Sequence, residues 1–150
     1  MIINSKQINP VLKQQLKDYV HPFVGIIHQV YKELPNGMPE YIYQEALELA
    51  FQQSEIPVEK EYRHHPVFRG TKLSSFLKMD LMIPGARGNV IIECKAIEEF
   101  TAKEYQQIFS YLFLFGTKFP IGILVNFHSY PQVDIQKFYY DKSDNTISPF

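Results

Sequence analysis

The chain has 150 residues, of which 45% are hydrophobic and 15% aromatic, and this composition predicts one globular domain over residues 1–150. Fifteen Lys and Arg nearly balance sixteen Asp and Glu, so the net charge of −1 excludes a strong overall basic excess. One cysteine excludes an intramolecular disulfide, and no apolar run approaches the roughly 20 residues of a transmembrane helix. With no leader-like segment at the start, we expect a cytoplasmic protein that stays out of the membrane.

The first third of the chain is predicted to be helical. Asn9-Pro10 pairs a good N-cap with proline at the first helical position, and apolar residues follow at helical spacing as far as Leu34. Pro22 predicts a kink or break within this helix, and the turn at residues 35–37 ends it. A second helix is expected from about Pro39 to about Ser54.

The middle of the chain has the short period and frequent turns of strands. Residues 58–73 show this pattern, and FLKMDLMI (76–83), PGARGN (84–89) and VIIECKAI (90–97) together predict a β-hairpin.

Helical spacing returns after the hairpin. Thr101 and Glu104 have the spacing of a capping box, apolar residues continue to Phe115, and Gly116 is a plausible C′ stop. Strands are expected at residues 120–127 and 133–140. The order of helices, three strands, a helix and two strands predicts an α/β or α+β fold, with helices packed on a mixed sheet.

The symmetry of the hairpin predicts its register, because strand side chains alternate between the two faces. If residues 84–89 connect the strands, Ile83 lies opposite Val90. One face is then apolar throughout, and it contains Leu77, Met79, Leu81, Ile83, Val90, Ile92, Cys94 and Ala96. This register assigns Cys94 to the core, and on the other face it places Asp80 opposite Glu93 and Lys78 opposite Lys95.

Directly opposed carboxylates destabilise a sheet unless a cation lies near them. Lys95 is two residues from Glu93 and diagonal to Asp80, so one interpretation is a solvated face with compensating ion pairs. The alternative is a bound Mg²⁺ or Mn²⁺, a hard ion that prefers carboxylate, carbonyl and water oxygens. With Lys95 as a nearby positive charge, such a site has the chemistry to hydrolyse phosphodiesters. Spacing alone leaves both interpretations open.

Three segments give the chain a family resemblance. An Asp, a gap of twelve residues and then Glu-x-Lys, here Asp80, Glu93 and Lys95, resembles the PD-(D/E)XK nuclease superfamily, which has the restriction-endonuclease-like fold. GMPEYIY, with Gly37, Glu40 and Tyr43, is similar to the signature of the GxxExxY family within it. Downstream, QIFSYLFLFGTKFPIGILVNF (107–127) resembles that family's Q-x-x-x-Y helix and the strand that follows.

The resemblance implies a fold and a set of site residues. The implied fold is a mixed central sheet flanked by helices with core order α-β-β-β-α-β, an extra N-terminal helix and a C-terminal strand. Asp80, Glu93 and Lys95 become the catalytic core, with Glu40 reaching the metal through water. The implied metal is Mg²⁺ or Mn²⁺, held by Asp80, Glu93, the Cys94 backbone carbonyl and Glu40 through water. Gln107 and Tyr111 are four residues apart on one side of their helix, where they support the site or contact the nucleic-acid backbone.

Two functions fit this pattern. The first is a Mg²⁺-dependent nuclease acting on nucleic acid, with DNA favoured over RNA, alone, as a homodimer or with a protein partner. The second is a catalytically idle nuclease-fold module that binds nucleic acid or protein, because a shared fold does not establish an activity.

Two other groups of residues have less specific patterns. His64-His65 is not expected to bind a metal, since adjacent strand residues point to opposite faces. A set of basic residues along the predicted strands forms either a local phosphate-binding path or a solvated face. These residues are Lys60, Arg63, Arg69, Lys72 and Lys78.

Overall fold

The structure is a computed structural model that describes residues 5–116 and 118–150. Its helices are α1 (Pro10–Glu33), α2 (Glu40–Gln53) and α3 (Ala102–Phe115). Its strands are β1 (Glu59–His64), β2 (Val67–Phe68), β3 (Thr71–Lys72), β4 (Leu77–Ile83), β5 (Val90–Lys95), β6 (Ile121–Asn126), β7 (Asp134–Asp141) and β8 (Thr146–Pro149).

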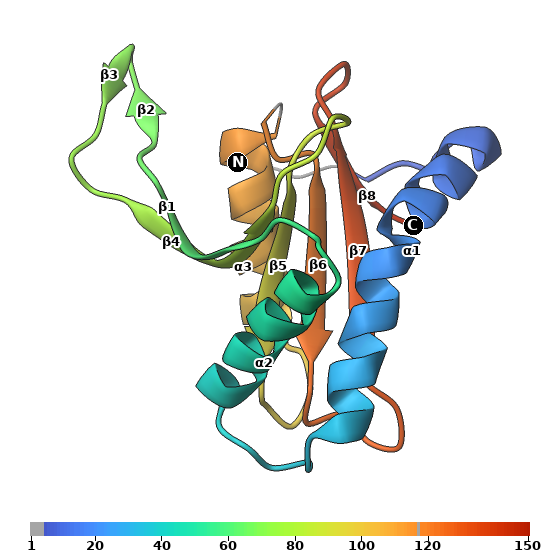
Figure 1. The fold of residues 1–150 in the computed structure, drawn as a ribbon. Helices are drawn as coiled ribbons and strands as arrows, with labels where there is room; N and C mark the ends of the chain where they lie inside the picture. Colours follow the sequence, from blue (N-terminus) through green and yellow to red (C-terminus); the bar gives the residue numbers. More distant parts are fainter. Residues whose placement is uncertain (1–4, 117) are drawn as a thin grey trace.

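Six strands form the main sheet, in the order β1-β4-β5-β6-β7-β8, with only β5 and β6 parallel. Helices α1 and α2 cover one face of this sheet and α3 covers the other (Figure 1). The predicted α/β fold class and its core order are therefore confirmed, with β1, β4 and β5 as the three strands between α2 and α3. The C-terminal extension contains two strands, β7 and β8, where one was predicted.

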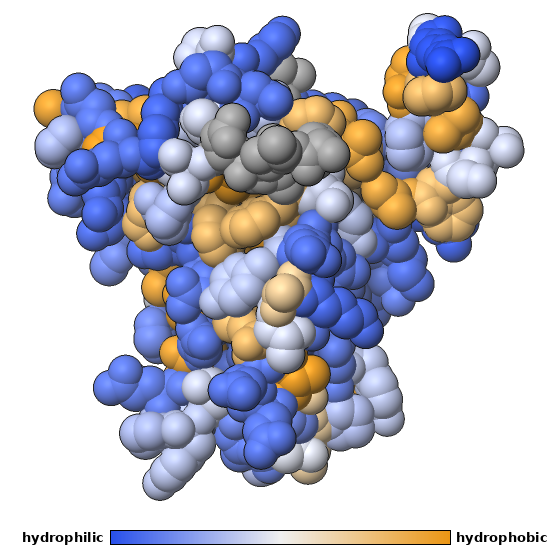
Figure 2. All heavy atoms as spheres, turned by 180° about the vertical axis from the view of Figure 1, so that it is seen from behind, coloured by the Kyte–Doolittle hydropathy of each residue, from blue (hydrophilic) through white to orange (hydrophobic). Residues whose placement is uncertain are grey.

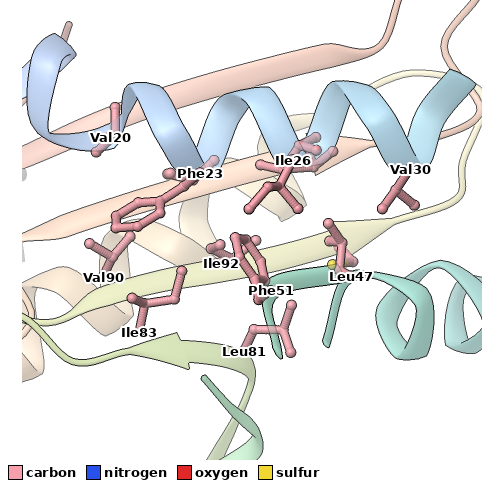
Figure 3. Close-up of a cluster of buried hydrophobic side chains, with 14 of the residues drawn as sticks. Val20, Phe23, Ile26, Val30, Leu47, Phe51, Leu81, Ile83, Val90 and Ile92 are labelled. Carbon is pink, nitrogen blue, oxygen red and sulfur yellow. The ribbon is translucent and has the colours of Figure 1, made fainter. Parts of the chain in front are cut away.

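The long first helix is continuous through Pro22. The Asn9 side chain caps it by accepting a hydrogen bond of 2.8 Å from the Val11 N–H. Its apolar stripe contributes Val20, Phe23, Ile26 and Val30 to the core on the α1/α2 face. In Figure 3 these side chains meet residues from α2, β4 and β5, namely Leu47, Phe51, Leu81, Ile83, Val90 and Ile92.

The third helix begins as predicted but ends for a different reason. Thr101 and Glu104 form the expected capping box. Gly116 has a right-handed φ of −46°, so it is not a left-handed C′ stop. A Cβ at this position would lie 2.1 Å from the Tyr140 ring on β7. Glycine is therefore required by the close approach of a tyrosine and not by the turn.

The β4–β5 register is confirmed near the loop, where Ile83 pairs with Val90 and Leu81 with Ile92. The prediction that Met79 shares a face with Cys94 is wrong. Met79 and Leu77 pack on the α3 face, whereas Cys94 and Ala96 pack on the α1/α2 face.

The face change has a backbone cause at the level of Asp80. The β1–β4 ladder pairs Lys60 with Leu81 and Tyr62 with Met79, but Glu61 and Asp80 between them are not paired. Glu61 has a φ of 55°, in the left-handed region that interrupts regular strand geometry. The side-chain alternation of β4 therefore restarts at Asp80, and this is where the candidate site lies.

Candidate active site

Asp80 and Glu93 lie side by side where the β4–β5 ladder ends. The backbone pairing of β4 with β5 stops at Leu81 and Ile92, and beyond this pair backbone N–H groups of the two strands donate to side chains. The Asp80 N–H donates to Glu93 Oε1 at 3.2 Å, and the Cys94 N–H donates to Asp80 Oδ2 at 2.8 Å. The structure thus brings together the two acids that the register placed opposite each other.

Burial makes this acid pair electrostatically unfavourable when both groups are ionised. Glu93 is only 2% exposed, and its pKa is raised well above the usual value, first by burial and then by the charge of Asp80. Burial also raises the pKa of Asp80, although the hydrogen bond from the Cys94 N–H opposes the shift. The charge of an ionised Asp80 therefore favours a proton on Glu93 in the absence of a cation.

Lys95 does not neutralise the pair by direct contact. Among residues 5–116 and 118–150, no ion pair within 4.0 Å joins Lys95 to either acid. Its Nζ instead donates to Gln107 Oε1 on α3 at 2.8 Å. Its charge still acts at longer range, since it lowers the pKa of Asp80, Glu93 and Glu40. The geometry argues against the compensating ion pairs that the spacing left open.

Gln107 and Tyr111 form a short polar path on α3 next to the pair. Gln107 accepts from Lys95 and donates from Nε2 to the Tyr111 hydroxyl at 3.3 Å. Burial first, and then the charge of Glu93, raise the pKa of Tyr111 to about 12, so the phenol stays protonated at neutral pH. Ile108 and Leu112 of the same helix pack in the core, and the Tyr111 ring belongs to the same buried cluster.

Glu40 is the first residue of α2 and lies close enough to the acid pair to feel the charge of Asp80. It is half-buried, and its pKa is raised by burial and by the charge of Asp80. Within the described ranges, no three side chains of His, Cys, Asp or Glu come close enough together to hold a metal by themselves. A metal at Asp80 and Glu93 would therefore need backbone and water oxygens as well.

Tyr43 fixes the loop that leads into α2 and so places Glu40. Its hydroxyl donates to the Pro35 carbonyl at 2.6 Å and accepts from the Met38 N–H at 3.2 Å. The buried ring stacks on Phe127 with centroids 4.6 Å apart. Gly37, with a φ of +90°, allows the loop to turn. The spacing of Gly37, Glu40 and Tyr43 thus has a local structural reason.

Gln44 is a positioning residue that sequence reasoning missed. It is buried one helical turn after Glu40, and its Nε2 donates to the Asp80 carbonyl at 3.2 Å. This bond joins α2 directly to the strand residue at the centre of the site. The signal in the sequence is its spacing of four residues from Glu40, which places both on one side of α2.

The other reactive side chains have structural surroundings. Cys94 is fully buried and burial raises the pKa of its thiol, so it does not supply a thiolate nucleophile. His64 packs against Phe115 with ring centroids 3.8 Å apart, while His65 Nδ1 lies 3.0 Å from the Leu73 carbonyl. The two histidines do not converge on one site, as the strand alternation predicts.

Comparison with known proteins gives one result that covers most of the chain. A family model described as the PD-(D/E)XK nuclease superfamily matches residues 6–138, which include the acid pair, Lys95 and the three helices. No curated protein and no solved structure gives a significant match. No helix in the described part of the chain is long and apolar enough to cross a membrane.

Proposed function

Because the chain belongs to the PD-(D/E)XK nuclease superfamily, we propose that it is a divalent-metal-dependent nuclease that hydrolyses phosphodiester bonds in DNA. The observation that carries this proposal is the buried pair Asp80 and Glu93, which has no cation in direct contact among the described residues. Two adjacent buried carboxylates are unstable when both are ionised, and a divalent ion is a direct way to stabilise them.

The oxygens present suit a hard cation. The hydrogen bonds between the strands use one oxygen of each carboxyl, Asp80 Oδ2 and Glu93 Oε1. The proposed ligands are these two carboxylates, the Cys94 carbonyl, and Glu40 through water. Mg²⁺ and Mn²⁺ accept such a mixture of carboxylate, carbonyl and water oxygens. When bound, the ion supplies Lewis acidity, which acidifies water and polarises a phosphoryl oxygen.

The remaining residues have distinct tasks in the proposed reaction. Lys95, oriented by Gln107, places a positive charge where negative charge develops on the phosphate, or orients the attacking water. Gln107 and Tyr111 hold this orientation from α3. Gln44 fixes the backbone of Asp80, and Tyr43 fixes the start of α2 and hence Glu40. We also propose that the chain belongs to the GxxExxY family. The support is the spacing of Gly37, Glu40 and Tyr43, together with the hydrogen bond by which Tyr43 fixes the start of α2.

The test is a cleavage assay on single-stranded, double-stranded and branched DNA and on RNA, with Mg²⁺, Mn²⁺ or EDTA. We expect cleavage of DNA that requires the divalent ion. Glu93→Ala and Lys95→Ala should each lower the rate at least about 100-fold while circular dichroism stays unchanged. Glu98→Ala, which changes an exposed Glu beyond the end of β5, is the matched control and should retain the wild-type rate.

Calorimetry with Mg²⁺ or Mn²⁺ separates the two functions that the sequence suggested. Cleavage that survives Glu93→Ala, or that needs no divalent ion, contradicts the assigned site. A wild-type protein that binds no divalent ion and cleaves none of the substrates is instead the idle nuclease-fold module.

A further inference from the structure

The chain between β1 and β4 forms an arm, residues 65–76, that leaves the body of the molecule. Its strands β2 and β3 pair only with each other, as a separate two-stranded sheet. Figure 1 shows the arm projecting away from the main sheet, and Figure 2 shows apolar and strongly hydrophilic groups beside each other on it. An isolated two-stranded hairpin gains little stability from packing, so its sequence is free to serve another purpose.

The tip of the arm is a tight and well-defined turn. Arg69 and Gly70 have φ values of 51° and 78° between the paired residues Phe68 and Thr71. Positive φ at both central residues is the geometry of a two-residue hairpin turn, in which Asn-Gly is strongly preferred. Arginine adopts this conformation rarely, which points to a use for its charge at this position.

The arm carries exposed aromatic rings that are paired with arginines. Phe68 is 60% exposed, and the Arg69 guanidinium lies 5.1 Å from its ring centroid. Near the base, Phe76 is 44% exposed and the Arg63 guanidinium lies 4.7 Å from its centroid. Large apolar rings in water are unfavourable, and here they are not buried by the body of the protein.

The charge of the segment has one sign. From Tyr62 to Met79 the sequence contains no Asp or Glu, but it contains Arg63, Arg69, Lys72 and Lys78, of which Lys78 pairs with Glu61 at 3.8 Å. The rest of the chain must therefore be net acidic, since the whole has a net charge of −1. A local basic surface with exposed aromatic rings complements a polyanion whose bases are open to stacking.

We propose that the arm binds a single-stranded segment of nucleic acid and leads it to the acid pair. An unpaired base stacks on Phe68, and Arg63, Arg69 and Lys72 contact phosphates. Duplex DNA keeps its base faces covered, so the exposed rings favour unpaired bases. Strand β4 runs from the arm directly to Asp80, so a strand bound along the arm is led toward the acid pair. That the bond is cleaved at this pair rests on the proposed function.

The chain length between arm and site limits the reach. Lys72 and Asp80 are eight residue steps apart along the chain, and at about 3.3 Å per step they are separated by at most about 26 Å. At about 3.4 Å per nucleotide, this corresponds to roughly eight nucleotides. A dinucleotide substrate therefore reaches the acid pair without touching the arm, and an oligonucleotide of about 16 nucleotides reaches both.

Phe68→Trp gives a direct test of stacking, because the protein contains no tryptophan of its own. In EDTA, a single-stranded oligonucleotide of about 16 nucleotides should quench the fluorescence of this residue as it binds. Phe68→Ala should weaken binding about 5- to 100-fold, measured by anisotropy of a labelled oligonucleotide. A blunt duplex should bind at least about 10-fold more weakly than the single strand.

Arg69→Asn separates charge from fold. Asn-Gly suits the turn better than Arg-Gly, so the arm should stay folded while it loses one charge. The affinity should fall, and the slope of log K against log salt should decrease by about 0.7. Arg87→Asn, in the exposed loop at the other end of β4, is the matched control and should leave both quantities unchanged.

Each alternative has its own signature. Unchanged binding in Phe68→Ala, unquenched Phe68→Trp, or equal affinity for duplex and single strand overturns the proposal. A change of oligomeric state in Phe68→Ala, with binding intact, instead makes the arm a contact with a second copy and also overturns it. Arg87→Asn should leave the cleavage of both a dinucleotide and the longer oligonucleotide unchanged. If the wild type binds through the arm but cleaves nothing with Mg²⁺ or Mn²⁺, only the proposed nuclease function fails.

Discussion

At the level of single residues, the orientation of Lys95 depends on one amide. Gln107 accepts from the Lys95 Nζ and donates to the Tyr111 hydroxyl, so it holds a flexible cation at a fixed position beside the acids. Lysine side chains lose considerable rotamer freedom when they are held in this way. A group that supplies this restraint affects the rate without touching the substrate.

Gln107→Ala should lower kcat about 10-fold, because Lys95 is then free to leave its position. KM and the affinity for the divalent ion should change little, since the acid pair is untouched. Gln106→Ala is the matched control, as it removes the same side chain from an exposed position of the same helix. A similar loss of rate in Gln106→Ala would show that the effect comes from α3 as a whole and not from the bond to Lys95.

Glu93 makes the stability of the metal-free protein depend on pH. Its pKa in the folded state is raised well above the unfolded value, first by burial and then by Asp80. The folded state therefore holds a proton that the unfolded state releases, and stability falls as pH rises from the unfolded pKa through the folded one. Glu93→Gln removes the charge that causes this loss.

In EDTA at pH 8, Glu93→Gln should raise the free energy of unfolding by about 1 to 3 kcal/mol. The gain should shrink as the pH approaches 4.5, where the wild-type carboxyl is protonated in the folded state. Urea titrations at several pH values measure both effects. The exposed Glu98→Gln should change stability by less than about 0.5 kcal/mol throughout. A gain independent of pH would mean that packing, and not charge, explains the result.

At the level of secondary-structure elements, the loop before α2 is tied to the helix by the hydroxyl of Tyr43. His128 adds a further contact, with Nε2 2.7 Å from the Met38 carbonyl. The position of Glu40 at the first turn of α2 depends on this loop. The aromatic stack with Phe127 depends only on the ring.

Tyr43→Phe separates these two contributions, because it keeps the ring and removes the hydroxyl. The free energy of unfolding should fall by about 1 to 2 kcal/mol, as the Pro35 carbonyl and the Met38 N–H lose their part-buried bonds to the Tyr43 hydroxyl. Metal-dependent cleavage should also fall, and by more than the lower stability explains, because the loop no longer holds Glu40 in place. Tyr41→Phe, at an exposed position of the same helix, should affect neither quantity.

The same elements show what the sequence could and could not predict. The helices, the capping box and the loop half of the β4–β5 register follow from local patterns and alternation. The face change at Asp80 does not, because Glu61 adopts its left-handed conformation without a glycine to mark it. β8 has only four residues, and its burial of Ile147 depends on pairing with β7. Such short strands carry no pattern of their own.

The part of the site that follows from strand alternation and helical spacing was also predictable from the sequence. Hairpin symmetry indicated that Asp80 and Glu93 are neighbours, and helical spacing indicated that Gln107 and Tyr111 share a side of α3. The bond from Lys95 to Gln107 and the bond from Gln44 to Asp80 join elements that are distant in sequence. A single sequence carries no signal for such contacts, which depend on how the helices pack on the sheet.

At the level of the whole molecule, the acid pair links metal binding to the stability of the fold. Asp80 lies on β4 and Glu93 on β5, next to the centre of the six-stranded sheet, and Gln44 connects the pair to α2. An ion that binds only when these elements are assembled stabilises the folded state by mass action. At 100 times its Kd, this amounts to about 2.7 kcal/mol.

Mg²⁺ or Mn²⁺ at that concentration should therefore raise the Tm at pH 8 by about 5 to 10 °C, measured by calorimetry without substrate. The increase should be lost in Glu93→Gln, which is the more stable protein in EDTA but cannot hold the ion with a second carboxylate. It should also shrink as the pH falls, because protons compete with the ion for the same two carboxyls. An equal rise of Tm in wild type and Glu93→Gln would place the ion elsewhere, and no rise in either would remove the metal from the site.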